Sequence, residues 1–337
     1  MTSSPEITQP VAQRRKWRSG GARLSGKGRI NLRRIVVFAL CLGAFGVALL
    51  AFRSVVANRV DPDAARAAVA RSQEYLKASN ASAARSQAFG AVRADPQWGE
   101  AHLALARASL ALDEGIAAEA SLRRALDNGV APKRIHALMA HAILLQSDPR
   151  RALVEANKAL AANPSGPDHL YAIRVRTRAY LAGGNLAAAQ ESALAAVHLA
   201  PDDANVWTDL GRFRANAGDM VGAIEAAGKA TQLDSGNTDA LILRGELVRS
   251  QYGLVASLPW FEAALKRDPY RHGALIQYAA TLGDAGRSRD MLAVTRRAME
   301  VRPRSPQALY LQAVLAARAE QFDLARQLLQ RAGSGIA

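Results

Sequence analysis

Cysteine, aromatic residues and β-type alternation are all scarce in this chain of 337 residues. A single cysteine, Cys41, excludes an intramolecular disulfide and a cysteine-based zinc site. Aromatic residues make up 5% of the chain, and no stretch shows the alternation of branched or aromatic with polar residues that a β-sandwich or barrel requires. Alanine dominates instead, with 72 copies. The composition therefore predicts an all-α protein.

Catalytic motifs are missing as well. The sequence contains no phosphate-binding glycine loop, no G-x-S-x-G elbow, no H-E-x-x-H motif and no paired cysteine and histidine. Its six histidines are scattered, and His136 and His141, five residues apart, would lie on different faces of a helix. We therefore predict that the protein is not an enzyme, and we expect no cofactor and no metal site.

Positive charge is concentrated at the N-terminus. Residues 1–34 contain nine basic residues and one acidic residue, Glu6, so they contribute +8 to the formal net charge of +15. This segment lacks apolar periodicity, which predicts a disordered basic tail that would lie in the cytoplasm. A nucleic-acid-binding protein more often carries its excess charge on the folded part, so nucleic acid is an unlikely partner.

One uncharged apolar run follows the tail. Residues 35–52 would form a helix about 27 Å long, which matches the hydrocarbon core of a bilayer. We predict a transmembrane helix here, followed by a linker at residues 53–61. Because basic residues are denser before the run, the N-terminus would be cytoplasmic and the remainder periplasmic, in a single-pass inner-membrane protein. The alternative is a signal peptide cleaved after Ala57. Arg14-Arg15 lies too far from the run for a convincing twin-arginine signal.

The rest of the chain repeats with a period of 34 residues. Proline marks the period, with one step of 37 where Ser165-Gly166-Pro167 reads as an inserted loop. The marking residues are Pro62, Pro96, Pro164, Pro201, Pro269 and Pro303. Val130 and Ser235 stand where two further prolines would fall, so residues 62–337 form about eight units. These units leave no room for a separate catalytic domain.

Small residues recur at fixed places in each unit. One position is always alanine: Ala91, Ala125, Ala159, Ala196, Ala230, Ala264, Ala298 and Ala332. A second position is always small: Ser72, Ala106, Ala140, Thr177, Gly211, Gly245, Ala279 and Ala313. Turns fall between these positions, at Gly184, Gly218 and Gly286. The pattern predicts two antiparallel helices per unit, with small residues where helices approach closely.

These columns resemble the tetratricopeptide repeat (TPR) family over about four-fifths of the chain. The clearest unit reads Trp207-x-x-Leu210-Gly211 and continues with Ala223 and Ala230, and the next unit matches at Phe261 and Ala264. The departures are Arg71, Arg176, Arg244 and Gln312, where the family usually has a bulky apolar residue. The resemblance implies a solenoid in which helix pairs form a right-handed superhelix. It also implies a concave face, lined by the first helix of each unit.

By this resemblance, the residues that face the groove are mostly arginines. They are Arg107, Arg134, His141, Tyr171, Arg174, Arg178, Asn205, Arg212, Glu246 and Arg249. The planar guanidinium group suits carboxylates and other oxyanions. An acidic peptide, a carboxyl terminus or an anionic glycan would therefore fit such a groove. The alternative is that these arginines only solvate a helix face.

Our leading hypothesis is a membrane-anchored scaffold or adaptor that mediates protein–protein interaction in cell-envelope machinery, such as polysaccharide export, secretion or pilus assembly. The pathway rests on analogy alone. An alternative is a regulatory subunit that positions a membrane-associated glycosyltransferase or peptidoglycan enzyme. A third is a binder of nucleic acid or anionic lipid that acts through the basic tail. An organelle-anchored receptor of opposite orientation is disfavoured by the charge bias around the apolar run.

Overall fold

The computed structural model describes residues 60–333. The chain divides into two units, Met1–Arg59 and Val60–Ala337. The predicted basic tail, the predicted transmembrane helix and most of the predicted linker lie outside the described residues. Among the residues described, no helix is long and apolar enough to cross a membrane.

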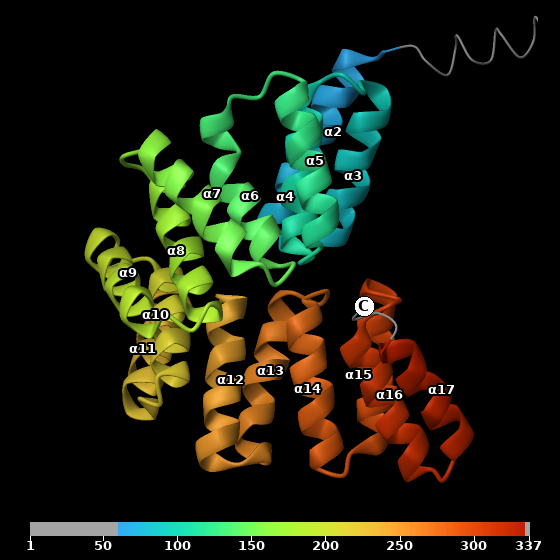
Figure 1. Cartoon of the computed structure of the whole chain (residues 1–337). Coiled ribbons are helices and arrows are strands. Elements are labelled where there is room, and N and C mark those ends of the chain that lie inside the picture. Colours follow the sequence, from blue (N-terminus) through green and yellow to red (C-terminus); the bar gives the residue numbers. More distant parts are fainter. Residues whose placement is uncertain (1–59, 334–337) are drawn as a thin grey trace, which may run out of the picture. The chain divides into compact units, whose positions relative to one another are not determined.

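The described part of the chain consists of sixteen α-helices and one short 3-10 helix, and it contains no strand (Figure 1). The first eight helices are α2 (Pro62–Lys77), α3 (Ala81–Ala94), α4 (Gly99–Ala111), α5 (Gly115–Asp127), α6 (His136–Leu144), α7 (Pro149–Ala162), α8 (Pro167–Ala182) and α9 (Leu186–Leu199). The last eight are α10 (Ala204–Asn216), α11 (Met220–Leu233), α12 (Thr238–Tyr252), α13 (Leu254–Arg267), α14 (His272–Asp284), α15 (Ser288–Val301), α16 (Pro306–Arg318) and α17 (Phe322–Gly333). The 3-10 helix η1 (Pro132–Arg134) precedes α6.

The helices form a chain of hairpins. Each even-numbered helix packs against the odd-numbered helix that follows it, and each hairpin packs against the next one (Figure 1). The prediction of an all-α helical solenoid is therefore confirmed for residues 60–333.

The recurring small residues lie where helices meet. The eight alanines of the invariant column are all buried, with exposed fractions from 0% to 7%. The second column is just as enclosed, and at Gly245 a side chain has no room at all. A Cβ atom there would lie 2.7 Å from the ring of Phe261, which is itself fully buried. Small residues thus set the distance between helices, because any larger side chain would push the backbones apart.

Side-chain caps and glycines define the hairpin ends. The carboxylate of Asp61 accepts a hydrogen bond from the backbone N–H of Ala64 at 2.9 Å, directly before α2. Gly184, Gly218 and Gly286 have positive φ angles of 75°, 85° and 78° in the turns predicted from the sequence. Glycine is favoured there because it has no Cβ atom to clash in the left-handed region.

Two irregular places follow the breaks in the proline pattern. Gly166 has a φ angle of +86° directly before α8, but the loop between α7 and α8 is no longer than most other loops between hairpins. The predicted loop insertion is therefore wrong, because the extra residues lengthen α8 to 16 residues at its N-terminal end. Val130 replaces a proline and is buried, and η1 follows it before α6 begins at His136. This third hairpin consequently has a first helix of only nine residues.

The arginines at usually apolar positions contact the neighbouring helix of the same hairpin. Arg71 donates from Nε to Gln87 on α3 at 2.9 Å, and Arg176 donates from Nε to Ser192 on α9 at 3.3 Å. Arg244 lies over the Trp260 ring, with its guanidinium carbon 4.4 Å from the ring centroid. The arginine stems cover the core while the guanidinium groups hold adjacent helices together.

Candidate functional site

A cavity of about 630 Å³ lies among the first helices of several hairpins. We call it the arginine pocket. It is lined by Leu76, Arg107, Leu110, Ala111, Asp113, Leu138, His141, Leu144, Leu145, Tyr171, Arg174, Arg178, Asn205, Arg212, Asp239 and Arg271. Leucines from α2, α4 and α6 form an apolar part, and arginines from α4, α8, α10 and the start of α14 form a cationic part. Its volume is within the range of small-ligand sites.

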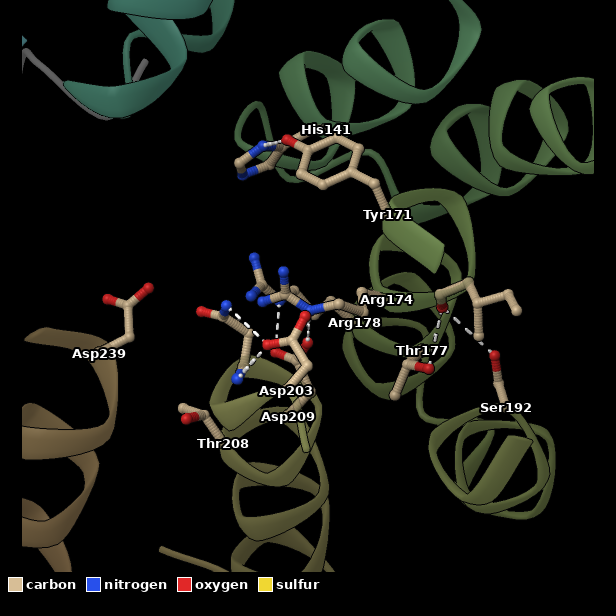
Figure 2. Close-up of polar contacts among 12 residues, drawn as sticks. His141, Tyr171, Arg174, Thr177, Arg178, Ser192, Asp203, Thr208, Asp209 and Asp239 are labelled. Carbon is tan, nitrogen blue, oxygen red and sulfur yellow. Dashed lines mark hydrogen bonds and ion pairs between the residues drawn. The ribbon is translucent and has the colours of Figure 1, made fainter. Parts of the chain in front are cut away.

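Two of the arginines share one buried carboxylate. Asp209 on α10 accepts a hydrogen bond from Nε of Arg174 at 2.7 Å and from Nε of Arg178 at 2.8 Å (Figure 2). The Asp209 side chain is 2% exposed. Burial by itself lowers the pKa of Arg178, but the negative charges of Asp209 and Asp239, together with the hydrogen bond to Asp209, raise it above its ordinary value. Both guanidinium groups are therefore fixed in place by the same carboxylate.

Arg271, the residue directly before α14, is also paired. It donates from Nη2 to Asp239 of α12 at 2.6 Å. Burial raises the pKa of Asp239, yet the charges of Arg271 and then Arg212 lower it to about 2. Asp239 is thus ionised at neutral pH. Its carboxylate is a negative charge among the arginines that line the pocket.

His141 on α6 and Tyr171 on α8, one turn before Arg174, form a neutral pair in the wall of the pocket. Nδ1 of His141 lies 2.6 Å from the hydroxyl of Tyr171, and the two rings meet edge to face at 68° (Figure 2). Burial, followed by the charges of Arg178 and Arg174, lowers the pKa of His141 to about 3. Burial also raises the pKa of Tyr171. Neither side chain is charged at neutral pH, so the pair supplies hydrogen-bonding groups only.

Among the arginines of the pocket, Arg107 and Arg212 have the fewest side-chain partners that neutralise their positive charge. Within residues 60–333, no hydrogen bond or ion pair engages Arg107. Arg212 has only a long contact, 3.9 Å from Nη1 to Glu246. Burial raises the pKa of Glu246. These two guanidinium groups are consequently the best placed to receive an anion.

Seven of the ten residues predicted for the groove line the arginine pocket: Arg107, His141, Tyr171, Arg174, Arg178, Asn205 and Arg212. The other three do not line it. Arg134 lies in η1 and binds both carboxylate oxygens of Glu100, with Nη2 to Oε2 at 3.0 Å. Glu246 faces Arg212, and Arg249 donates to the hydroxyl of Thr281 at 3.3 Å.

The sequence interpretation missed the acidic residues of the site: Asp113, Asp209 and Asp239. A signal for two of them was available, because opposite charges recur about one repeat apart. Arg174 and Asp209 are 35 residues apart, Arg178 and Asp209 are 31 apart, and Arg271 and Asp239 are 32 apart. Residues one period apart occupy adjacent hairpins, where side chains can meet. In the described part of the chain, no cluster of histidine, cysteine and carboxylate residues could hold a metal ion.

Comparison with known proteins agrees with this architecture. A family model described as tetratricopeptide repeat matches residues 176–240 and 274–335. Among solved structures, the fold is similar to a chain in "Crystal structure of APC/C hetero-tetramer Cut9-Hcn1", with a TM-score of 0.57 and 11% identity. That match covers 80% of this chain and 52% of the other, so this chain spans about half of the other's length.

A second similar structure is a tetratricopeptide repeat protein from Parabacteroides merdae ATCC 43184. It has a TM-score of 0.47 and 13% identity, and the match covers 70% of this chain and 92% of the other. No curated protein matches the sequence. The repeats, the helical hairpins and the matched residues together define a protein built from helix-pair repeats. The chain contains tetratricopeptide repeats, which the family model matches at residues 176–240 and 274–335.

Proposed function

We propose that this protein is a non-enzymatic scaffold that binds an acidic segment or the carboxyl terminus of a partner protein in the arginine pocket. The observation that carries the proposal is the pairing pattern of the pocket. Arg107 has no ion-pair partner among residues 60–333, and Arg212 has only one distant partner. An arriving carboxylate can occupy these groups without displacing a buried ion pair.

The way in which Arg174 and Arg178 bind Asp209 supports this function. Asp209 engages Arg174 and Arg178 through Nε, so their terminal nitrogens can still donate to a ligand. Planar guanidinium groups bind carboxylates through two parallel hydrogen bonds, which fixes orientation as well as affinity. Apolar side chains beside them, such as Leu110 and Leu138, can cover the aliphatic part of a peptide.

Peptide binding can be tested with purified full-length protein and a fluorescent peptide of glutamate residues. We expect the variant with both Arg107→Ala and Arg212→Ala to bind at least about a hundredfold more weakly, because two charge-assisted hydrogen-bond partners are lost. Arg93→Ala, an exposed residue of α3 that does not line the pocket, is the matched control. Equal affinity in all three proteins would refute the proposal. Displacement of the peptide by an anionic glycan would instead identify the glycan as the ligand.

We further propose a place for this scaffold in the cell. The apolar run at residues 35–52 would anchor the chain in the inner membrane, with the N-terminus cytoplasmic and the repeats in the periplasm. There it would organise cell-envelope machinery such as polysaccharide export, secretion or pilus assembly. This part rests on the sequence and on family analogy.

Topology has a direct test. Alkaline phosphatase fused at the C-terminus is active only outside the cytoplasm, whereas green fluorescent protein exported by the same route stays dark. We expect an active phosphatase fusion, a dark fluorescent fusion, and protein that stays in the membrane fraction after alkaline carbonate extraction. A bright fluorescent fusion would refute the orientation, and full extraction by carbonate would refute the anchor.

A further inference from the structure

Two segments far apart in the sequence meet at the edge of the arginine pocket. Asp113 lies in the turn between α4 and α5, and Arg302 directly follows the last residue of α15. Nη2 of Arg302 lies 3.1 Å from Oδ2 of Asp113. The same nitrogen donates to the backbone carbonyl of Leu112, 190 residues away in the sequence.

This contact differs from the rest of the packing. Extensive contacts between the described helices join neighbours or next neighbours in the chain, as expected for a solenoid. A hydrogen bond across 190 residues bypasses this order, because it joins the second hairpin directly to the loop between α15 and α16. The two segments are held by polar groups at their tips, and a few polar contacts can open and close far more readily than a packed interface.

The contact is also part of the pocket wall. Asp113 lines the arginine pocket together with Arg271. Burial lowers the pKa of Arg271, but the charges of Asp239 and then Asp113 raise it. Asp113 therefore acts electrostatically on an arginine inside the pocket while it is bonded to one at the edge. A second anion in the pocket would repel Asp113 and compete with it for these positive charges.

We propose that Asp113 and Arg302 form a clasp that closes the arginine pocket, and that entry of an anionic ligand is coupled to opening of this clasp. The coupling rests on the proposed function of the pocket, whereas the clasp itself does not. Coupling is reciprocal: if an anion favours the open clasp, opening the clasp increases the affinity for the anion.

The geometry suits a reversible contact. The side chains of Arg302 and Asp113 are 25% and 32% exposed, so water can replace either partner when they separate. Nε of Arg302 is buried and makes no hydrogen bond, so the closed state leaves one donor unsatisfied. This unsatisfied donor lowers the advantage of the closed state over the open one. Asp113 has a φ angle of +53° in the α4–α5 turn, a left-handed conformation that aspartate and asparagine adopt more readily than most residues.

The clasp can be tested by measuring a distance between the two segments. Spin labels are placed at Gln73→Cys on α2 and Tyr310→Cys on α16, two exposed sites, in the full chain with Cys41→Ser. Pulsed electron resonance then gives the distribution of distances between the labels. We expect one narrow, short distance in the parent protein. In Arg302→Ala we expect longer distances and an open-to-closed ratio about tenfold higher, since a charge-assisted contact is lost.

Two further variants make the result specific. Asp113→Asn should also open the clasp, and asparagine tolerates the left-handed backbone, so this variant is expected to fold even if Arg302→Ala does not. Arg304→Ala, an exposed arginine two residues from Arg302, is the matched control and should keep the parent distance. Parent distances in both Arg302→Ala and Asp113→Asn would overturn the clasp.

Adding a peptide of glutamate residues tests the coupling. We expect the peptide to shift the parent protein toward the long distances and to bind Asp113→Asn more tightly than the parent. If the variants open but the peptide binds neither protein, the proposed function fails and the clasp stands. If the peptide binds but leaves the distances and the relative affinities unchanged, the coupling is refuted.

Discussion

The buried carboxylate of Asp209 accepts a hydrogen bond from Nε of Arg178 at 2.8 Å. Because Arg174 binds the other carboxylate oxygen, the two arginines neutralise a charge that could not otherwise remain inside the protein. Arg174 and Arg178 therefore stabilise the fold and also line the pocket. Replacing them would lower stability and binding together, so the two effects could not be separated in a binding experiment.

The first prediction concerns this buried carboxylate. Replacing both Arg174 and Arg178 by alanine should lower the free energy of unfolding by about 3–5 kcal/mol, since Asp209 is left buried without a partner. Urea denaturation followed by circular dichroism at 222 nm measures the change. Arg107→Ala, which breaks no ion pair, should leave the unfolding midpoint where it is. Equal midpoints for the double variant and Arg107→Ala would contradict this assignment.

The second prediction concerns the geometry of anion binding. Lysine keeps the positive charge of arginine but lacks its planar fork. Arg107→Lys should therefore bind a glutamate peptide with an affinity between those of the parent and Arg107→Ala. Fluorescence polarisation at several salt concentrations measures this, and affinity should fall as salt rises. If Arg107→Lys binds as weakly as Arg107→Ala at low salt, geometry rather than charge controls the site. If all three proteins bind equally, Arg107 makes no contact with the peptide.

The third prediction concerns pH. The pKa of His141 is about 3 in the folded protein and about 6.5 as the ordinary value. Between these values the unfolded chain binds a proton that the folded protein does not, so stability is complete above pH 6.5 and falls as pH decreases toward 3. His272, with a pKa of about 4, acts in the same direction.

Thermal unfolding at pH 7 and pH 5 tests this effect. The melting temperature of the parent protein should fall between the two pH values, and that of His141→Gln should fall less. Asp239, whose pKa is about 2, affects stability only below its ordinary value of 3.8 and so lies outside this range. An identical decrease in both proteins would show that His141 is not the group responsible.

The fourth prediction concerns the spacing of the helices. Gly245→Ala places a methyl group 2.7 Å from the Phe261 ring, so we expect a loss of about 1–3 kcal/mol in the free energy of unfolding. Gly228→Ala on α11 is the matched control, because its nearest neighbour is an arginine nitrogen at 3.7 Å. Alanine is the better helix former there, and the change should stabilise by about 0.5–1 kcal/mol. Opposite signs in the two variants confirm the prediction, and similar effects refute it.

Local features of the fold were readable from the sequence. Gly184, Gly218 and Gly286 predicted turns because few other residues adopt a positive φ angle without strain. The invariant alanines predicted close helix contacts, since a repeated small residue has the same environment in each hairpin. The neutral state of His141 was not readable, because it follows from burial and from the charges of Arg178 and Arg174, which other helices bring near it.

The sequence by itself therefore determined the class of fold, the length of the repeat and the abundance of arginine among the residues that line the arginine pocket. These properties depend on interactions within one hairpin or between adjacent hairpins, which a periodic sequence repeats each time. Only the tertiary structure decided which arginines are neutralised, as Arg178 is by Asp209, and which, like Arg107, are not. It also decided that Asp113 meets Arg302, because that contact depends on the curvature accumulated over many hairpins, which no single repeat specifies.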